Sequence, residues 1–509
     1  MPADPDPTPY PLDHLALRGA PRAPALILRD RTLSFEELNA RVGLLAGWLA
    51  AQGFERGARV ATWLPKSELA CLMPLAAVRA GLVHVPVNPL LKRAQVAHIL
   101  ADSGAALLMA NAARLATLEP GDAASAGPVD EAQAWRDAEA LGDVREPGSG
   151  GAHDLAAILY TSGSTGKPKG VMLSHANLWL GAVSVAHYLK LAPDDRVLAV
   201  LPLAFDYGQN QLLSSWYAGA GVAPLDYLTP RDVVKAVGRH GITTLAAVPP
   251  LWLQLVEQAW PDDAAQRLQR LTNSGGALTV SLVRRLRETF PLADLYPMYG
   301  LTEAFRSTYL DPALVDAHPT SIGGAIPFAE VMVVADDGAL AGPDEEGELV
   351  HAGPLVAQGY WQDAARAAER FKPAPSFSDM GGSAVWSGDR VRRDAEGLLH
   401  FVGRRDAMIK TSGTRVSPQE VEDAAVATGL VAEAVAIGLP DPLLGAAIHL
   451  VVRAMPGADR DVLLPELARS LPNFMVPRAV HWRDAMPVGP NGKLDRVALA
   501  AELAKDTVA

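Results

Sequence analysis

The sequence contains a single cysteine, Cys71, among its 509 residues. One cysteine excludes an internal disulfide framework and any cysteine-rich zinc or iron–sulfur site. Its surroundings, ELACLMPL, are apolar and predict a thiol buried inside a helix. Hydrophobic residues make up 49% of the chain, which is enough for an extensive core.

Long uninterrupted hydrophobic segments are also missing. The first residues, MPADPDPTPY, have neither the basic stretch nor the apolar stretch of a secretory signal. The most apolar segment, 71–91, is interrupted by Arg79, His84 and three prolines, so it is unsuited to spanning a membrane. We therefore expect a cytoplasmic protein without a membrane span.

An excess of positive charge is absent as well. The 45 Lys and Arg residues against 57 Asp and Glu residues give a net charge of −12. This balance argues against a protein that wraps nucleic acid, although it is compatible with a local basic groove. The 44 glycines and 40 prolines indicate many loops but not disorder or collagen. At roughly 150 residues per domain, the length predicts two to four domains.

Hydrophobic patterning predicts alternating helices and strands, which favours an α/β fold. Ser34 and Glu37 form a capping-box signature before a helical stripe that ends at Gly53. The runs at 59–64, 196–201 and 243–248 are typical of strands.

Two segments, 119–152 and 373–383, are interpreted as weakly structured connections because they are rich in small and turn-forming residues. The last hundred residues, after Gly403, are interpreted as a separate small domain. They contain β-like runs at 434–437 and 448–452, a helix-like stretch at 463–471 and a final basic loop.

The strongest functional signal is YTSGSTGKPKG at 160–170, which directly follows the apolar run 155–159. Small hydroxyl and glycine residues let backbone N–H groups approach a phosphate chain, and Lys167 and Lys169 add positive charge. The segment is not a Walker A loop, because Pro168 follows Lys167. A flexible surface turn is the alternative.

YTSGSTGKPKG resembles the phosphate loop of the adenylate-forming superfamily, which includes acyl-CoA synthetases, adenylation domains of peptide synthetases and luciferases. Further motifs of that family follow in order, and together they cover the chain from about Leu33 to Arg496. The resemblance implies a large α/β N-terminal domain of several subdomains with mixed sheets at 1–403. It also implies a hinge at 404–406 with Asp406 as the hinge residue, and a mobile α+β C-terminal domain at 407–509.

The resemblance also implies an ATP site built from the phosphate loop and from NSGGA, YGLTE, WSGD, FVGR and PVGPNGK. In this family Tyr299 would stack on the base, Asp389 would accept the ribose hydroxyls, and Glu303 would hold Mg²⁺. For Asp389 and Arg404, a simple surface ion pair is the alternative. The implied ATP-binding residues are Thr161, Ser162, Gly163, Ser164, Thr165, Gly166, Lys167, Gly275, Gly276, Ala277, Tyr299, Gly300, Thr302, Asp389, Phe401, Arg404 and Lys493.

The expected chemistry follows from charge. A carboxylic acid with a pKa near 4.3 is already ionised at neutral pH, so it needs no general base to attack the α-phosphate. The resemblance implies Thr302, Glu303 and Lys493 as catalytic residues: Mg²⁺ on Glu303, the phosphate loop and Lys493 would neutralise the repulsion between the two anions and align the attack, and Thr302 would bond to phosphate. A solvated, inert Lys493 is the alternative.

A thiol then displaces AMP from the acyl-adenylate. In this family the small domain swings between the two steps and opens a tunnel for pantetheine. Lys410, Thr411, Ser412, Gly413 and Arg415 would face the second active form.

The acid pocket is expected around Asp206 of LAFDYG. Many acyl-CoA synthetases have a histidine there, whereas amino-acid-activating domains have an aspartate that pairs with the substrate ammonium group. Arg306 falls at another pocket position, and mutual neutralisation of Asp206 and Arg306 is the alternative. Further candidates, whose mixed polarity does not suit a long fatty acyl chain, are Tyr207, Asn210, Thr272, Ser274, Met298 and Ser307.

FDYG, LTNSGG and MYGLTEAFRSTYL are similar to two groups within the family. One group loads L-proline onto a carrier protein, and the other comprises exosortase-associated acyl-CoA ligases. Because no carrier domain follows Lys493, we expect a separate carrier protein, with Arg404, Arg405, Lys410 and Arg415 as a docking patch. A CoA thioester of a short or aryl acid is the alternative.

Two other readings have less support. A non-catalytic relative would be expected to lose Lys493, Glu303 or the hydroxyls of the phosphate loop, and all are present. Nothing in the sequence supports luciferase-type oxidation.

Overall fold

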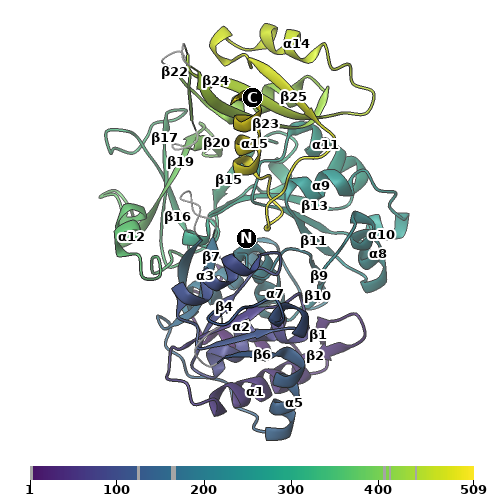
Figure 1. The fold of residues 1–509 in the computed structure, drawn as a ribbon, viewed down its shortest axis with the longest axis vertical. Helices are drawn as coiled ribbons and strands as arrows, with labels where there is room; N and C mark the ends of the chain where they lie inside the picture. Colours follow the sequence, from purple (N-terminus) through teal and green to yellow (C-terminus); the bar gives the residue numbers. More distant parts are fainter. Residues whose placement is uncertain are drawn as a thin grey trace.

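The computed structural model describes residues 4–122, 127–161, 168–404, 408–411, 414–441 and 444–508. Figure 1 shows these residues in three levels along the long axis of the molecule. The purple and blue N-terminal elements lie at the bottom, teal elements occupy the middle, and the yellow-green C-terminal elements form the top.

The longest sheet runs in the order β2-β1-β10-β9-β11-β12-β13-β14-β15-β20-β19-β17-β16, and β18 pairs with β19. Neighbouring strands from β10 to β13 are parallel, whereas those from β13 to β16 are antiparallel. Its strands are β1 (Pro24–Ile27), β2 (Thr32–Ser34), β9 (Arg196–Ala199), β10 (Gly221–Pro224), β11 (Thr244–Ala247), β12 (Arg270–Asn273), β13 (Asp294–Tyr299), β14 (Thr308–Tyr309), β15 (Ser321–Ala325), β16 (Glu330–Val334), β17 (Glu346–Ala352), β18 (Phe371–Pro373), β19 (Ser383–Arg393) and β20 (Leu399–Arg404).

A second sheet runs in the order β6-β5-β3-β4-β7-β8 and is parallel except for the pair β7–β8. Its strands are β3 (Arg59–Trp63), β4 (Val83–Pro86), β5 (Leu107–Ala110), β6 (Pro128–Asp130), β7 (Leu155–Thr161) and β8 (Lys169–Ser174). Thr161 pairs with Lys169 across this hairpin, so the two ends of the predicted phosphate loop are held side by side.

Helices cover these sheets, and α2, α6 and α7 are buried along most of their length. The helices of the larger body are α1 (Phe35–Ala51), α2 (Glu68–Arg79), α3 (Arg93–Ser103), α4 (Ala112–Leu115), α5 (Glu131–Leu141), α6 (His175–Tyr188), α7 (Asp206–Tyr217), α8 (Pro230–His240), α9 (Pro249–Leu255), α10 (Asp262–Arg267), α11 (Val280–Thr289) and α12 (Ala364–Arg370), with 3₁₀ turns η1 (Leu12–Leu17), η2 (Thr302–Ala304) and η3 (Pro312–Leu314). Among the described helices, none combines the length and the apolar character needed to cross a membrane.

The C-terminal body has its own small core, in which Val421, Leu450, Val452 and Leu467 are buried together. It contains β21 (Ile409–Thr411), β22 (Thr414–Val416), β23 (Val431–Asp441), β24 (Gly445–Ala454), β25 (Ala479–Arg483), α13 (Pro418–Ala427), α14 (Leu463–Ser470), η4 (Asn473–Met475) and α15 (Arg496–Val508). The expected fold class, a large α/β body with a small α+β body, is confirmed.

Several local predictions are also confirmed. Ser34 and Glu37 form a capping box that starts α1, and Cys71 is buried in α2, where burial raises the pKa of its thiol. The predicted strands at 59–64, 196–201, 243–248, 434–437 and 448–452 all contain β-structure, and α14 falls within the predicted helix at 463–471.

The interpretation of 119–152 as a weakly structured connection is wrong in its middle part. Asp130 caps α5, whose small residues Ala134 and Ala138 are buried where the helix lies against α1. Alanine is the best helix former, so the residues that were read as loop-like stabilise a short helix once it has a surface to cover.

Gly208, in the first turn of α7, positions that helix against the preceding loop. A Cβ atom at this position would overlap the carbonyl oxygen of Pro202. We expect Gly208→Ala to destabilise the protein by about 1–3 kcal/mol in denaturant unfolding. Gly238→Ala in α8 is the matched control, because the nearest atom to its new Cβ is 3.9 Å away and alanine favours a helix. Equal effects of the two substitutions would contradict the close contact at Gly208.

Candidate active site

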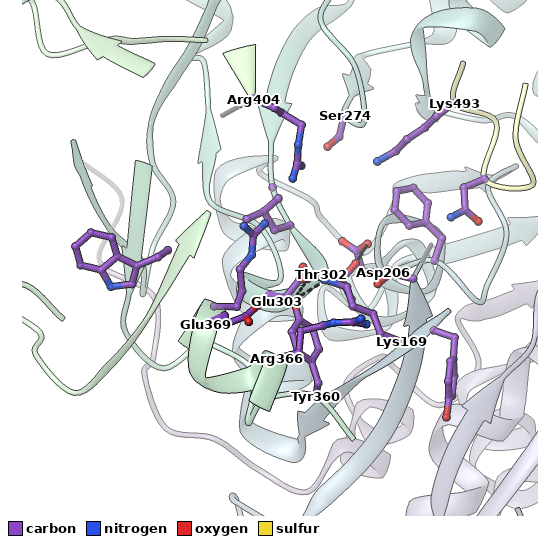
Figure 2. Close-up of a pocket in the computed structure, with 18 of the residues that line it drawn as sticks. Lys169, Asp206, Ser274, Thr302, Glu303, Tyr360, Arg366, Glu369, Arg404 and Lys493 are labelled. Carbon is purple, nitrogen blue, oxygen red and sulfur yellow. Dashed lines mark hydrogen bonds and ion pairs between the residues drawn. The ribbon is translucent and has the colours of Figure 1, made fainter. Parts of the chain in front are cut away.

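A cleft of about 500 Å³ lies where the carboxyl ends of the parallel strands meet the C-terminal body. In open α/β sheets ligands bind at this edge, because the loops after the strands converge there. Figure 2 shows side chains from both bodies converging on it. The lining residues are Tyr160, Thr161, Lys169, Ala204, Phe205, Asp206, Ser274, Gly300, Leu301, Thr302, Glu303, Glu348, Tyr360, Arg366, Glu369, Arg370, Lys372, Trp386, Arg404, Asn491 and Lys493.

Glu303 lies at the floor of the cleft, bonded to two side chains that come from other elements (Figure 2). Lys169 Nζ is 2.9 Å from Glu303 Oε1, and the Tyr360 hydroxyl donates to the same oxygen at 2.6 Å. Burial opposes ionisation of Glu303, but Lys169 and Tyr360 outweigh it and lower the pKa of this carboxyl. The cleft therefore presents an ionised carboxylate.

The turn after β13 directs neighbouring side chains to different places. Phe305 has φ +61°, a backbone conformation that is rare outside glycine, and it follows η2 directly. Thr302 and Glu303 line the cleft before this turn, whereas Arg306 lines a separate inner cavity after it.

Asp206 begins α7 and lies in the cleft beside Thr302 (Figure 2). The Thr302 hydroxyl donates to Asp206 Oδ1 at 3.0 Å. Burial raises the pKa of Asp206, and the positive charges of Arg306 and Lys493 act in the opposite direction. A cationic group bound beside Asp206 would favour its ionised form.

Asp389 and Arg404 face each other because their strands β19 and β20 pair in register at these two residues. Arg404 Nη1 lies 3.4 Å from Asp389 Oδ1, so the ion pair considered from the sequence is present. Its acidic end is buried, since Asp389 is only 3% exposed and accepts a hydrogen bond from the Tyr299 hydroxyl, whereas the Arg404 side chain is 42% exposed. The ring centroid of Phe401 lies 6.3 Å from that of Tyr299. Four of the predicted nucleotide-binding side chains are thus contiguous.

Lys493 reaches the cleft from the segment between β25 and α15, which descends in yellow toward the middle of the molecule in Figure 1. Its Nζ lies 4.9 Å from the centre of the Phe205 ring (Figure 2). Gly275 makes room for it, because a Cβ there would lie 2.6 Å from Lys493 Cε. Burial lowers the pKa of Lys493. Because Lys493 is buried in the cleft, it is not the solvated, inert lysine considered as the alternative.

The turn that carries Lys493 is held against the larger body. Asn88 Nδ2 donates to the Pro490 carbonyl and to Asn491 Oδ1, both at 3.0 Å. Arg453 adds a contact of 3.6 Å to Glu257 of the larger body. The two bodies therefore meet with Lys493 turned inward.

The predicted acid-pocket residues do not form one group. Asp206 and Ser274 line the main cleft, whereas an inner cavity of about 20 Å³ adjoins Tyr207, Asn210, Thr272, Met298 and Arg306. Ser307 is buried but lines neither space.

Arg306 is 2% exposed, and its guanidinium lies 4.5 Å from the centre of the Tyr207 ring. The Tyr207 hydroxyl is 2.7 Å from Thr272 Oγ1. Among the described residues Arg306 has no carboxylate within 4.0 Å, so direct pairing with Asp206 is absent there. Charge neutralisation between the two acts only over a longer distance.

Some predicted residues are placed elsewhere or are not described. Gly276 and Ala277 are exposed beside the cleft rather than lining it, and Gly275 contacts Lys493. Outside the described residues lie Ser162, Gly163, Ser164, Thr165, Gly166, Lys167, Arg405, Asp406, Ser412 and Gly413, and the side chains of Lys410 and Arg415 are not described either.

Sequence reasoning missed the contribution of α12 and of Tyr360. Arg366, Glu369 and Arg370 all line the cleft from α12. Arg366 and Arg370 are four residues apart, which is the spacing of side chains on one helical face, and this spacing was visible in the sequence. Tyr360 carried no signal of that kind, because its partner Glu303 is distant in the chain.

Glu303 is compatible with a magnesium ion shared with a nucleotide. Mg²⁺ is commonly bound through one or two carboxylates together with substrate phosphates, rather than by an all-protein cage. Within the described part of the chain no group of three potential His, Cys, Asp or Glu metal ligands is present. The residues thus fit Mg²⁺ if ATP supplies the other ligands.

A nucleotide-sized cleft at the strand ends, closed by a lysine from a second body, defines a nucleotide-using enzyme of the α/β class. Residues 14–361 match the AMP-binding enzyme family, and residues 420–493 match its C-terminal domain. The chain belongs to the AMP-binding enzymes, and it is an AMP-forming acid–thiol ligase.

Named relatives span different substrates. Novobiocin biosynthesis protein H of Streptomyces niveus is 34% identical over 95% of this chain and 80% of its own length. The L-proline–[L-prolyl-carrier protein] ligase of Pseudomonas fluorescens is 32% identical, over 95% of this chain and 97% of its own. Feruloyl-CoA synthase of Amycolatopsis is 31% identical over 94% of this chain and 95% of its own length.

The ATP-bound crystal structure of MatB from Rhodopseudomonas palustris shares this fold. Its TM-score is 0.86 at 25% identity, over 98% of this chain and all of that chain.

The ionised state of Glu303 gives a pH-dependent stability. Because its folded pKa lies below the unfolded value of about 4.3, ionised Glu303 stabilises the fold above that pH, and the contribution is lost as the pH falls through the folded pKa. At neutral pH we expect the free energy of unfolding of wild type, measured with denaturant, to exceed that of Glu303→Gln by about 1.5–3 kcal/mol. The difference should shrink below about pH 4.3.

Glu466→Gln is the control, since its exposed pair with Arg469 should contribute at most about 1 kcal/mol. A Glu303→Gln difference that does not change with pH would show that Glu303 is not an ionised partner of Lys169.

Proposed function

We propose that this ligase activates a small amino acid such as L-proline as its adenylate and transfers it to the phosphopantetheine thiol of a separate carrier protein. The observation that carries the proposal is the Asp206 carboxylate, which lines the cleft within the electrostatic reach of Lys493. An amino-acid ammonium group beside Asp206 would supply the cation that this buried carboxylate needs. The relationship to L-proline–carrier protein ligases supports the same substrate class.

The size of the inner cavity supports a small acid. A space of about 20 Å³ holds little more than one water molecule, so a long acyl chain would require the surrounding side chains to move. Tyr207 and Thr272 close this space through their mutual hydrogen bond.

A second candidate function is an acyl-CoA ligase for a short or aryl acid. The buried Arg306 favours it, because its guanidinium suits an anionic or carbonyl-bearing substrate better than an ammonium group. The relationship to feruloyl-CoA synthase supports the same alternative.

In the proposed adenylation step, an oxygen of the ionised acid attacks the α-phosphorus of ATP. The bond between that phosphorus and the oxygen bridging to the β-phosphate breaks, and pyrophosphate leaves with the electron pair. Lys493 would offset the negative charge, and Thr302 would donate a hydrogen bond to a phosphate oxygen. Mg²⁺ bound at Glu303 would supply further positive charge to the phosphates.

The nucleotide itself would be bound by the ATP-binding residues predicted from the sequence. Asp389 would accept the ribose hydroxyls, with Arg404 beside it, and Tyr299 and Phe401 would contact the base. Thr161, at the start of the phosphate loop, has a buried hydroxyl without a partner among the described residues and would donate to a phosphate.

For the second step we propose that residues 407–509 rotate relative to residues 1–403 about a hinge at 404–406, with Asp406 as the pivot. The Lys493 turn fills the junction through the Asn88 hydrogen bonds, so a thiol needs it to withdraw. The thiol then gives up its proton to solvent, its sulfur attacks the acyl carbon to form a thioester, and AMP leaves with the electron pair of the acyl–phosphate bond.

Substrate identity is tested by ATP–pyrophosphate exchange across amino acids, aryl acids and short fatty acids. We expect exchange with L-proline or another small amino acid, reduced at least about tenfold in kcat/KM by Asp206→Asn, which keeps the volume but removes the charge. Exchange only with acids that lack an amino group would overturn the amino-acid proposal and favour the second candidate.

The role of Lys493 is tested by separating the half-reactions. Because Lys493 would stabilise charge only during adenylation, Lys493→Ala should reduce ATP–pyrophosphate exchange by about 100-fold or more. Thioester formation from preformed acyl-adenylate should stay near the wild-type rate. Lys505→Ala, an exposed lysine of the same body, is the control. Unimpaired exchange in Lys493→Ala would remove this lysine from the mechanism.

A further inference from the structure

Arg370 is a cleft residue to which no function has been given above. It is the last residue of α12, and its side chain lines the main cleft together with those of Glu303 and Arg404. A Cβ atom at Gly388 would lie 3.0 Å from Arg370 Nη1, so the guanidinium lies against the turn that precedes Asp389. The Arg370 guanidinium therefore lies beside Asp389, the buried carboxylate that faces Arg404.

The guanidinium also lies within electrostatic reach of the other end of the site. Burial raises the pKa values of the Tyr299 and Tyr360 phenols, and the charge of Arg370 acts in the opposite direction on both. Tyr299 donates to Asp389, and Tyr360 donates to Glu303. Arg370 thus lines the same cleft as Glu303 and lies within electrostatic reach of the two tyrosines that bind these carboxylates.

The charge of Arg370 lacks a protein partner among the described residues. Lys169 is paired with Glu303, Arg366 with Asp363 at 3.6 Å, and Arg404 with Asp389. For Arg370 the structure has no carboxylate within 4.0 Å in its described part, and its buried Nε has no acceptor there. Burying an unpaired guanidinium, even partly, costs folding free energy unless a bound anion pairs with its charge.

The position of Arg370 is set by a rigid connection. Phe371, the next residue, begins β18 and pairs with Val385 of β19. The same strand β19 carries Asp389, so Arg370 and Asp389 are held at a fixed separation by strand register.

We propose that Arg370 binds the phosphate chain of ATP during adenylation. This assignment rests on the proposed places of the ribose at Asp389 and of Mg²⁺ at Glu303, because the phosphates run between those two groups. The planar guanidinium can donate two parallel N–H bonds to phosphate oxygens. Arg370 transfers no proton: its N–H groups offset the charge on the phosphate oxygens while the acid oxygen bonds to phosphorus and pyrophosphate departs.

The test compares Arg370→Gln, Arg370→Lys and Arg392→Gln in the full chain. Arg392 is an exposed arginine of β19 paired with Asp344 and lies outside the cleft lining, which makes it the matched control. Equilibrium binding of adenosine, AMP and Mg²⁺-ATP is measured alongside ATP–pyrophosphate exchange.

We expect Arg370→Gln to bind adenosine like wild type, but to bind ATP roughly ten- to a hundredfold more weakly and to lose exchange kcat/KM by a similar factor. Arg370→Lys should recover part of the loss, because it keeps the charge without the planar fork. Weaker binding of AMP as well would locate the contact at the α-phosphate, and unchanged AMP binding would locate it at the β- and γ-phosphates; both support the proposal.

Unchanged ATP binding and exchange in Arg370→Gln would overturn the proposal. Equal weakening of adenosine and ATP would also overturn it, because it would show that Arg370 only supports the turn at Gly388. These outcomes are distinct from failure of the proposed function. If no carboxylic acid supports exchange in wild type, the ATP and adenosine affinities of the variants still measure the Arg370 contact.

Discussion

The burial of the Lys493 ammonium between the two bodies is the interaction on which the rest of the site depends. The chemistry of an AMP-forming ligase brings a carboxylate against a triphosphate, and both are anions. A cation that offsets this repulsion is most effective where water is excluded, yet burial there lowers its pKa. Asp206 and Asp389 lie close enough to favour the protonated lysine, so the site holds its own compensating charges.

The fold assembles these charges by bringing together the ends of strands that are distant in sequence. Residues that follow β9, β12 and β13 line one cleft, as expected for open α/β sheets. The antiparallel pair β19–β20 adds Asp389 and Arg404 in register. Among the residues that the structure describes, the C-terminal body contributes Asn491 and Lys493 to the lining of the cleft.

Much of this architecture could be predicted from the sequence because the motifs are local. The capping box at Ser34, the buried helix around Cys71 and the alternation of helices and strands all follow from short-range patterns. The interpretation of 119–152 failed for the opposite reason. Whether an alanine-rich segment forms a helix depends on the surface it covers, and α1 supplies that surface for α5.

Within the candidate site, too, some residues were predictable from local motifs and others depend on tertiary structure. The motif resemblance pointed to Glu303, Asp389 and Lys493, and all three side chains lie in or beside one cleft. It did not separate Asp206 from Arg306, because the positive φ at Phe305, after which Arg306 lines the inner cavity instead of the cleft, is a tertiary strain rather than a sequence pattern.

The sequence alone determined the family, the α/β class and the residue types that a nucleotide and an acid require, because these are encoded in contiguous motifs and in periodicity. Only the tertiary structure decided which carboxylates are buried, that Lys169 and Tyr360 ionise Glu303, and that α12 directs Arg370 toward the nucleotide cleft. Those properties depend on distances between segments far apart in the chain, and on the exclusion of water that their packing produces.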